Sequence, residues 1–352
     1  MIWQRLKNEW KRTWAFKLAT VFLLLLLVCM LFAPLLSAGF HPNFLDLSQT
    51  YQAPFSFSSH WLGTDQLGRD VWANLLYGSR TAFLVALPVM SLALVLGTGL
   101  GMAAAWFGNK RLHFSLASGI SFVLWLFAIW FYVFYRSGFS SEANENATGL
   151  FSRLVWLVVI STLAIVLKRL LKTVSFLAKK VPLPLDELLL KLIEVLASVP
   201  RLILVLSFAA LLSPGIANVL LLLSLTYWIG PARLARAETL KIKHLPFIEA
   251  AQASGLTVWR ILSRHVLPNA AAPLVTAFCF GLSGLLGLEA TLSFLGIGLP
   301  PETPSLGRML AGARLNTEAW WLVLFPAVLL CLTILAVQTI GQAFRRALEV
   351  KK

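Results

Sequence analysis

Charged residues are scarce in this chain of 352 residues: Asp, Glu, Lys and Arg make up 13% of it, against 58% for hydrophobic residues. Soluble domains usually carry about 25% charged residues, because charge is what covers a surface in water. The mean hydropathy is +0.79. These values exclude an ordinary soluble protein and indicate an integral membrane protein.

Acidic residues are scarcer than basic ones. The chain has 15 Asp and Glu against 30 Lys and Arg, which gives a net charge of +15. Such an excess of positive charge could suggest that the protein binds nucleic acid. The basic residues, however, cluster in short segments beside apolar runs, where they set the orientation of a chain in the membrane. We therefore expect membrane lipid, and no nucleic acid, as a partner.

Cysteine and the common catalytic motifs are also rare or missing. Cys29, Cys279 and Cys331 fall inside apolar runs without metal-ligand spacing, which predicts packing residues and no metal or cofactor. No Gly-Lys dipeptide occurs, so the phosphate loop of ATPases is absent, and neither a nucleophile elbow nor HExxH is found. The chain is not expected to be an enzyme, and any ATP must bind another polypeptide.

Long apolar runs are what the chain does contain, and a helix of about 20 such residues crosses a bilayer. They predict an all-α polytopic transmembrane helical bundle of about eight spans. The first run ends at Pro34 without a small-residue cleavage site, so we expect a retained helix and not a signal peptide. The predicted spans are residues 18–38, 81–107, 114–135, 150–170, 187–212, 216–235, 270–298 and 319–341.

The basic residues alternate between the segments that connect these spans. Most fall on the side of the N-terminus, which the positive-inside rule makes cytoplasmic. Both termini are then cytoplasmic. The opposite side keeps only Arg69, Arg80, Arg136, Arg153, Arg308 and Arg314.

The stretch "EAAQASGLTVWRILSRHVLPNA", residues 249–270, interrupts the apolar runs on the cytoplasmic side. Pro246 suits the first turn of a short helix, which Gly255 can end in the left-handed conformation. Thr257 can cap a second helix, and Pro268 closes it. In that helix one face is mainly apolar and the other carries Arg260 and Arg264. The predicted apolar face holds Val258, Ile261, Leu262, His265 and Val266.

Small residues in the first of these helices let a partner approach closely, which suggests a docking corner. The stretch resembles the "EAA" cytoplasmic loop of ATP-binding-cassette importer permeases, and "RHVLPNA" is similar to the dipeptide and oligopeptide branch. Two further stretches resemble that branch, "HWLGTDQLGRDVWANLLYGSRTAFLVAL" (residues 60–87) and "EATLSFLGIGLPPETPSLGRML" (residues 289–310). The residues that carry the match in the loop are Glu249, Ala250, Ala251, Gly255, His265 and Pro268.

This resemblance implies a type I importer permease fold in a bacterial inner membrane. It implies that the chain forms half of a heterodimeric pore with a second permease subunit. Two cytoplasmic ATPase subunits would push on the loops, and an external substrate-binding protein would deliver cargo. Glu249, near a helix N-terminus, could pair with an arginine of an ATPase, whereas His265 on the apolar face suits packing.

The external stretch "LGTDQLGRD" has two readings. Gly63 and Gly68 allow tight turns, and Asp65, Arg69 and Asp70 can form ion pairs that fold the segment over the pore mouth. It would then meet the binding protein or gate entry, or else it is a structural plug held by local hydrogen bonds.

Two charged residues fall inside predicted spans. Glu289 should face the bundle interior or a watery path, because an unpaired carboxylate in lipid is costly. Arg201 follows Pro200, which should kink its helix, and such kinks often line translocation paths. A pair between Arg201 and Glu289 is one possibility, and contact with substrate is another.

Compared with the family, the chain has an insert, residues 109–180, with two apolar runs that suggest a peripheral transmembrane hairpin or an accessory-partner site. The alternatives to peptide cargo are nickel chelates, opine-like compounds or antimicrobial peptides. An ion-driven secondary transporter or a membrane scaffold would be a different class. The predicted regions are 1–58 (tail, first span and external segment), 59–108 (external stretch and second span), 109–180 (insert), 181–346 (core permease with the coupling loop at about 236–268) and 347–352 (tail).

Overall fold

The computed structural model describes residues 7, 9–37, 40–56, 60–131, 147–174 and 179–348. Nearly all of its regular structure is helical, which confirms the predicted class. The chain divides into two compact units. The core unit is Met1–Trp106 with Leu189–Lys352, and the hairpin unit is Phe107–Leu188.

Five helical segments of the described residues are long and apolar enough to cross a membrane. A sixth candidate is bent: α9 (Leu185–Ser198) and α10 (Arg201–Ala209) meet at 79° around Pro200. Proline lacks an N–H and disfavours a helical residue before it, so the predicted kink is found as a full break. The five segments are α2 (Trp14–Leu31), α4 (Val71–Phe107), α11 (Ile216–Tyr227) joined to α12 (Ile229–Lys243), α16 (Ala271–Phe294) and α18 (Trp321–Leu348).

Several helix ends differ from the predicted spans, most clearly in the first two. The helix α4 begins at Val71 instead of residue 81, and the first span ends in a separate short helix, α3 (Ala33–Leu36), which has Pro34 in its first turn. The predicted span 114–135 extends past residue 131, outside the described part of the chain, whereas the predicted span 150–170 lies within one described helix. The total of eight spans therefore stays a prediction.

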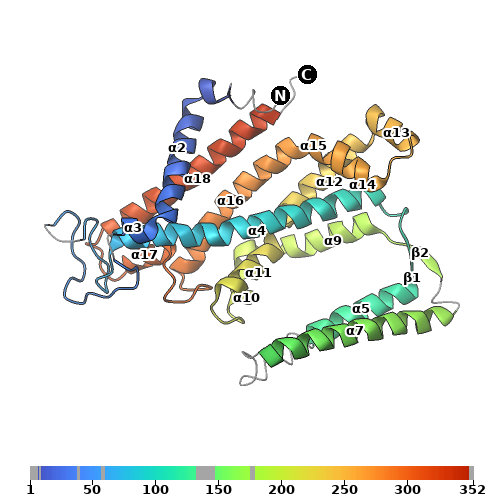
Figure 1. Cartoon of the computed structure of the whole chain (residues 1–352), viewed down its shortest axis with the longest axis horizontal. Helices are drawn as coiled ribbons and strands as arrows, with labels where there is room; N and C mark the ends of the chain where they lie inside the picture. Colours follow the sequence, from blue (N-terminus) through green and yellow to red (C-terminus); the bar gives the residue numbers. More distant parts are fainter. Residues whose placement is uncertain are drawn as a thin grey trace. The chain divides into compact units, whose positions relative to one another are not determined.

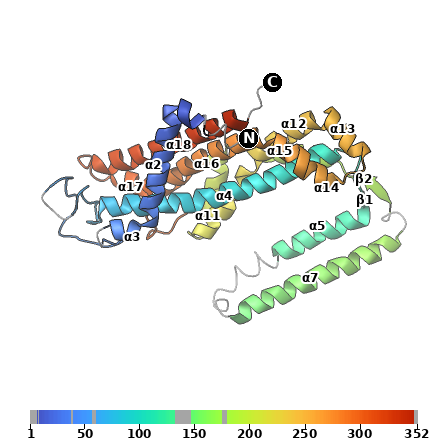
Figure 2. The same ribbon diagram turned by 45° about the horizontal axis from the view of Figure 1, so that its top comes forward.

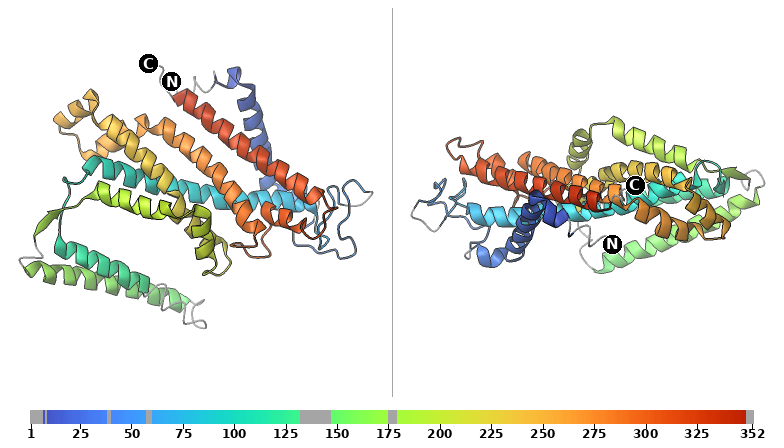
Figure 3. Two further views of the ribbon diagram at one scale, coloured as in Figure 1. Left: turned by 180° about the vertical axis from the view of Figure 1, so that it is seen from behind. Right: turned by 90° about the horizontal axis from the view of Figure 1, so that it is seen from above.

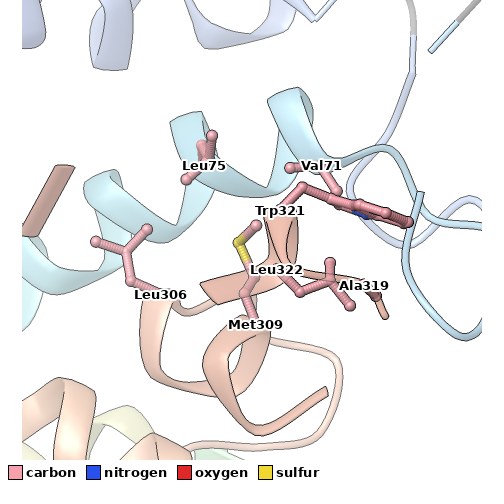
Figure 4. Close-up of a cluster of buried hydrophobic side chains, with 7 residues drawn as sticks. All are labelled: Val71, Leu75, Leu306, Met309, Ala319, Trp321 and Leu322. Atoms are coloured by element: carbon pink, nitrogen blue, oxygen red, sulfur yellow. The ribbon is translucent and has the colours of Figure 1, made fainter. Parts of the chain in front are cut away.

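In the core unit, α16 and α18 pack along each other and α2 packs on α18 (Figures 1 and 3). The short helix α17 (Leu306–Gly312) contacts both α16 and α18. Beside it, a buried apolar cluster joins the starts of α4 and α18 to α17 (Figure 4). The cluster consists of Val71, Leu75, Leu306, Met309, Ala319, Trp321 and Leu322.

The helices α4 and α12 approach each other at a glycine pair. Gly97 and Gly101 face the backbone of Trp228 and Ala232, and a Cβ at Gly101 would overlap the Ala232 carbonyl oxygen. Glycines four residues apart lie on one helix face and let two membrane helices come this close. The crossing fixes α12, whose end leads into the predicted docking stretch.

The main helices among the described residues of the hairpin unit are α5 (Leu116–Trp130) and α7 (Ala147–Thr173), which lie side by side (Figure 2). A two-stranded antiparallel ladder of β1 (His113–Ser115) and β2 (Lys180–Pro182) joins the chain at one end of this helix pair. This ladder is a small exception to the all-helical prediction. Its register pairs His113 with Pro182, Phe114 with Val181 and Ser115 with Lys180.

Candidate functional site

The polar stretch after α12 folds into two short helices, α13 (Pro246–Ala253) and α14 (Val258–Ile261). Pro246 lies in the first turn of α13, and Gly255 follows its end with φ +74°. This left-handed conformation costs glycine little and strains other residues. The predicted corner is therefore present. We call residues 245–261 the α13–α14 corner.

Apolar side chains on one side of the corner pack into the core unit. Other side chains of the corner are exposed. Ile248 and Ala251 are buried, whereas Glu249 is exposed and makes no ion pair within the described residues. Phe247 and Trp259 are large and exposed, and Trp259 keeps 79% of its surface accessible. An unpaired carboxylate and two exposed aromatic rings are features of a surface that binds a partner.

The second helix has the predicted faces, because Ile261, Leu262 and Val266 are buried while Arg260 and Arg264 are exposed. Thr257 stands at the start of α14 but makes no capping hydrogen bond with its side chain, so that expectation was wrong in detail.

Pro268 does not end the helix, in contrast to the prediction. A π-helical turn, η2 (Leu262–Val266), precedes it, and the chain continues through α15 (Leu267–Asn269) into α16. In this wider turn the Leu267 N–H bonds to the Leu262 carbonyl, five residues back. The extra width makes room for the proline ring, which would clash with the preceding turn of a regular helix. The second helix thus leads, through these short elements and a turn at Ala270, into a membrane helix.

His265, in this turn, is half-buried with its ring 6.5 Å from the ring of Phe247. It therefore connects the π-helical turn to α13, as expected of a packing residue.

A lysine anchors the other side of the corner. Lys243, the last residue of α12, donates from Nζ to the carbonyl oxygens of Ala105 (3.0 Å) and Trp106 (2.8 Å) at the end of α4. The last carbonyls of a helix have no partner within it, so a cation placed there satisfies them and suits the helix dipole. These two hydrogen bonds thus fix the end of α12, from which the corner begins, to the end of α4.

The external segment, residues 60–70, is packed tightly against its own chain. Gly63 and Gly68 have φ of +80° and +69°, and a Cβ at Gly68 would overlap the backbone of Asp46. The Oδ1 atom of Asp65 accepts hydrogen bonds from the backbone N–H groups of Leu67 (2.8 Å) and Arg69 (2.9 Å). These contacts form a closed turn.

The predicted ion pairs of Arg69 with the two aspartates are not found, and that expectation was wrong. Asp70 instead accepts from His60 Nδ1 at 2.9 Å, with both side chains buried, and its Oδ1 accepts from the Ala73 N–H at 2.7 Å. The second bond is an N-cap of α4, which explains why α4 begins ten residues early. Burial raises the pKa of Asp65 above its ordinary value, against the hydrogen bonds from Arg69 and Leu67.

Arg308 of α17 holds the loop that precedes it. Its guanidinium donates to the carbonyl oxygens of Leu299, Pro300, Pro301 and Thr303. Burial lowers the pKa of Arg308, and the charge of Arg69 acts in the same direction. Both arginines line a small polar pocket of about 60 Å³ together with Asp65. These hydrogen bonds hold the loop 299–303 to the start of α17, beside a pocket that the external segment also lines.

Glu289 faces the bundle interior, as predicted, with only 1% of its surface exposed. Its Oε1 atom accepts from the hydroxyl groups of Ser293 and Ser305, each at 2.9 Å. The suggested pair with Arg201 does not form. Arg201 is exposed beside the α9–α10 break, 4.3 Å from the centre of the Tyr227 ring. Glu289 therefore links α16 to the start of α17.

Sequence reasoning missed His60, Ser305 and Lys243. The capping aspartate before α4 and the GxxxG spacing of Gly97 and Gly101 were local signals that could have been read. His60, Ser305 and Lys243 find partners 10, 16 and 137 or 138 residues away, and no local pattern identifies such contacts.

These features define a multi-pass helical membrane protein with an exposed helical corner. The chain belongs to the family of binding-protein-dependent transport system inner membrane components, whose sequence model matches residues 173–350. This confirms the resemblance to importer permeases.

Curated relatives match over nearly the whole chain. The di/tripeptide transport system permease protein DppC of Pseudomonas aeruginosa is 27% identical over 94% of this chain and 86% of its own length. The dipeptide permease DppC of Alkalihalophilus pseudofirmus is 25% identical, with 95% and 86% covered. The glutathione permease GsiD of Pectobacterium atrosepticum is also 25% identical, with 99% and 91% covered.

Proposed function

We propose that this chain is a permease subunit of an ATP-binding-cassette importer for short peptides. It forms half of the pore with a second permease subunit. Two separate ATPase subunits drive it, and an external binding protein delivers the substrate. Membership of the binding-protein-dependent transport family supports this architecture. The peptide substrate is supported by relatives named for dipeptides, di/tripeptides and glutathione.

The α13–α14 corner docks into an ATPase subunit. The observation that carries this proposal is the surface of the corner, where the Glu249 carboxylate and the rings of Phe247 and Trp259 are exposed. Glu249 lies in the first turn of α13, where the helix dipole favours a carboxylate. An arginine of the ATPase can pair with it, while the aromatic rings enter an apolar pocket of the partner.

Glu249→Arg tests this docking. The spans should still insert, because the side chain is exposed, but the ATPase subunits should be lost on purification or hydrolyse ATP without responding to loaded binding protein. Arg260→Gln, also exposed, is the control and should have a mild effect, because single rim charges contribute little. If Glu249→Arg retains both the ATPases and stimulated hydrolysis, Glu249 is only a solvated charge.

Both termini, residues 109–113 and residues 236–268 are cytoplasmic in this proposal, and residues 39–79 and 136–149 are external. The asymmetry of the basic residues supports this orientation. Cysteine labelling in intact cells tests it. If Ser141→Cys reacts only after permeabilisation, the orientation is wrong.

Arg201 lies on the translocation path. Its exposed guanidinium, beside the break between α9 and α10, has no carboxylate partner within the described residues, and a cation is costly in lipid. The hydroxyl partners of Glu289 favour a structural role for that residue. Arg201→Gln should slow peptide uptake with the complex intact. Unchanged uptake would remove Arg201 from the path.

Residues 109–180 form a peripheral domain added to the core permease. In support, the Asn109 side chain bonds to the Glu187 N–H within the hairpin unit, so the two ends of the insert already lie close together. Joining Asn109 to Pro182 should leave a permease that inserts and assembles. A shortened protein that assembles normally but transports nothing would make the insert part of the mechanism.

A further inference from the structure

The hairpin unit contains a pocket that the proposed transport function does not use. It lies along the seam between α5 and α7 and has a volume of about 360 Å³. That size falls within the range of about 300–1,000 Å³ typical of small-molecule sites. Ser118 and Ser121 of α5 and Ser161 and Lys168 of α7 all line it.

The polar groups of the pocket gather at the end near the β1–β2 ladder. Ser118 lies in the first turn of α5, and Lys168 lies near the end of α7, which runs back toward the ladder. Lys168 is exposed and makes no hydrogen bond or ion pair within the described residues. Neither α5 nor α7 contains an acidic residue that could neutralise it. Neither helix that forms the pocket therefore compensates its positive end.

Farther from the ladder the seam becomes less polar. Trp125 Nε1 donates to the Ser161 hydroxyl at 3.1 Å, which satisfies the indole. Phe122 and Ile165 line the same pocket and are exposed, as are other large apolar side chains of both helices. Surfaces of this kind face lipid in a membrane protein, so a ligand reaches the pocket from the bilayer.

A cation beside a hydroxyl group at one end, followed by apolar walls, matches the order of charges in an anionic phospholipid. We propose that the pocket binds such a lipid. Lys168 pairs with the phosphate, the Ser118 hydroxyl contacts the headgroup, and the acyl chains follow Phe122 and Ile165. Basic pockets between membrane helices are suited to anionic headgroups, and the charge favours these over zwitterionic lipids. The proposal does not depend on which side of the membrane this end faces.

The test compares full permease complexes in nanodiscs of phosphatidylcholine with or without phosphatidylglycerol. Lipid retained after extraction is counted by native mass spectrometry. The wild-type complex should retain phosphatidylglycerol in preference to phosphatidylcholine. Lys168→Gln should reduce that preference about fivefold, the effect expected for one basic residue near a headgroup.

Arg169→Gln is the matched control, because it removes the same charge from the next residue of α7, which does not line the pocket. Its complex should keep the preference. Equal loss in both variants would mean general charge attraction, and no preference in the wild type would remove the site. Displacement of the lipid by free glycerol phosphate would identify a soluble phosphoester as the ligand. A small membrane protein lost only from Lys168→Gln would make the pocket a protein interface. Each of these results overturns the proposal.

Discussion

The external segment and the α13–α14 corner are both polar interruptions of an apolar chain, yet they are built in opposite ways. In the external segment, His60 and Asp70 bond to each other in a buried position, and Asp65 accepts from two backbone N–H groups. In the corner, Glu249 stays exposed and without an ion pair among the described residues. The acidic residues of the external segment thus have partners within the chain, whereas the carboxylate of the corner faces outward.

The glycines of the two regions differ in the same way. Gly68 and Gly255 have nearly equal positive φ, +69° and +74°. The backbone of Asp46 lies directly against Gly68, whereas no atom lies within 4 Å of the position of a Cβ on Gly255. A glycine with positive φ thus lies in a closed structure in the external segment and in an open surface at the α13–α14 corner.

Substitution of Gly68 or Gly255 by valine should give the largest difference between the two regions. Gly68→Val should destabilise the permease by at least ~3 kcal/mol, because backbone strain adds to a collision that no rotamer relieves. Gly255→Val should cost only about 1 kcal/mol and should impair ATPase coupling instead. Accumulation in membranes and thermal unfolding in detergent measure the difference. Equal losses at both sites would contradict the comparison.

Asp70→Ala should have the next largest effect. It removes the cap of α4 and the buried hydrogen bond between Asp70 and His60, so we expect a loss of about 3 kcal/mol in the free energy of unfolding. Glu249→Ala is the control and should change stability by less than about 0.5 kcal/mol. Thermal unfolding of both variants in one detergent provides the measurement. A stable Asp70→Ala protein would mean that the segment does not depend on this pair.

Two exposed tryptophans offer a matched test of the open surface. Trp259 in the corner and Trp61 in the external segment are 79% and 78% exposed. Neither change to alanine should affect stability. Trp259→Ala should weaken ATPase binding about tenfold or more, as for an interface anchor, and Trp61→Ala should leave it unchanged. Copurification at graded ATPase concentrations measures this, and equal binding by the two variants would remove Trp259 from the interface.

The smallest effect concerns Asp65 and pH. Its pKa is raised in the folded protein by burial, so the folded state holds the proton more tightly than the unfolded state. Stability is therefore lost as pH rises from the unfolded pKa of about 3.9 through the folded value. Asp65→Asn keeps an oxygen for the two backbone bonds and carries no charge. It should raise the melting temperature slightly at pH 7, and the gain should shrink as pH falls. A gain that grows on acidification would reverse this assignment.

Sequence patterns predicted the elements that depend on local rules. The span in α16 follows from apolar length, and the corner follows from Pro246 and Gly255, since both residues act on their own backbone. The π-helical turn before Pro268 was not predicted, because proline alone normally indicates a helix end. The proposed pair of Arg201 with Glu289 failed because opposite charge does not specify a partner. The hydroxyl groups of Ser293 in α16 and of Ser305, which caps α17, bond to Glu289 instead.

The short connection between the corner and α16, through η2, α15 and the turn at Ala270, has a mechanical consequence. With 24 residues and a rise of about 1.5 Å each, α16 is a rod of ~36 Å whose far end carries Glu289 and its bonds to α17. A tilt of about 10° at the corner would displace that far end by ~6 Å if the rod stayed straight. The π-helical turn, Leu262–Val266, lies outside this rod, between it and the corner, and it interrupts the regular α-helical hydrogen-bond pattern. Under the proposed function, in which an ATPase pushes on the corner, this turn would be one place where the connection to α16 can bend, and its stiffness would set how much of the displacement reaches the far end.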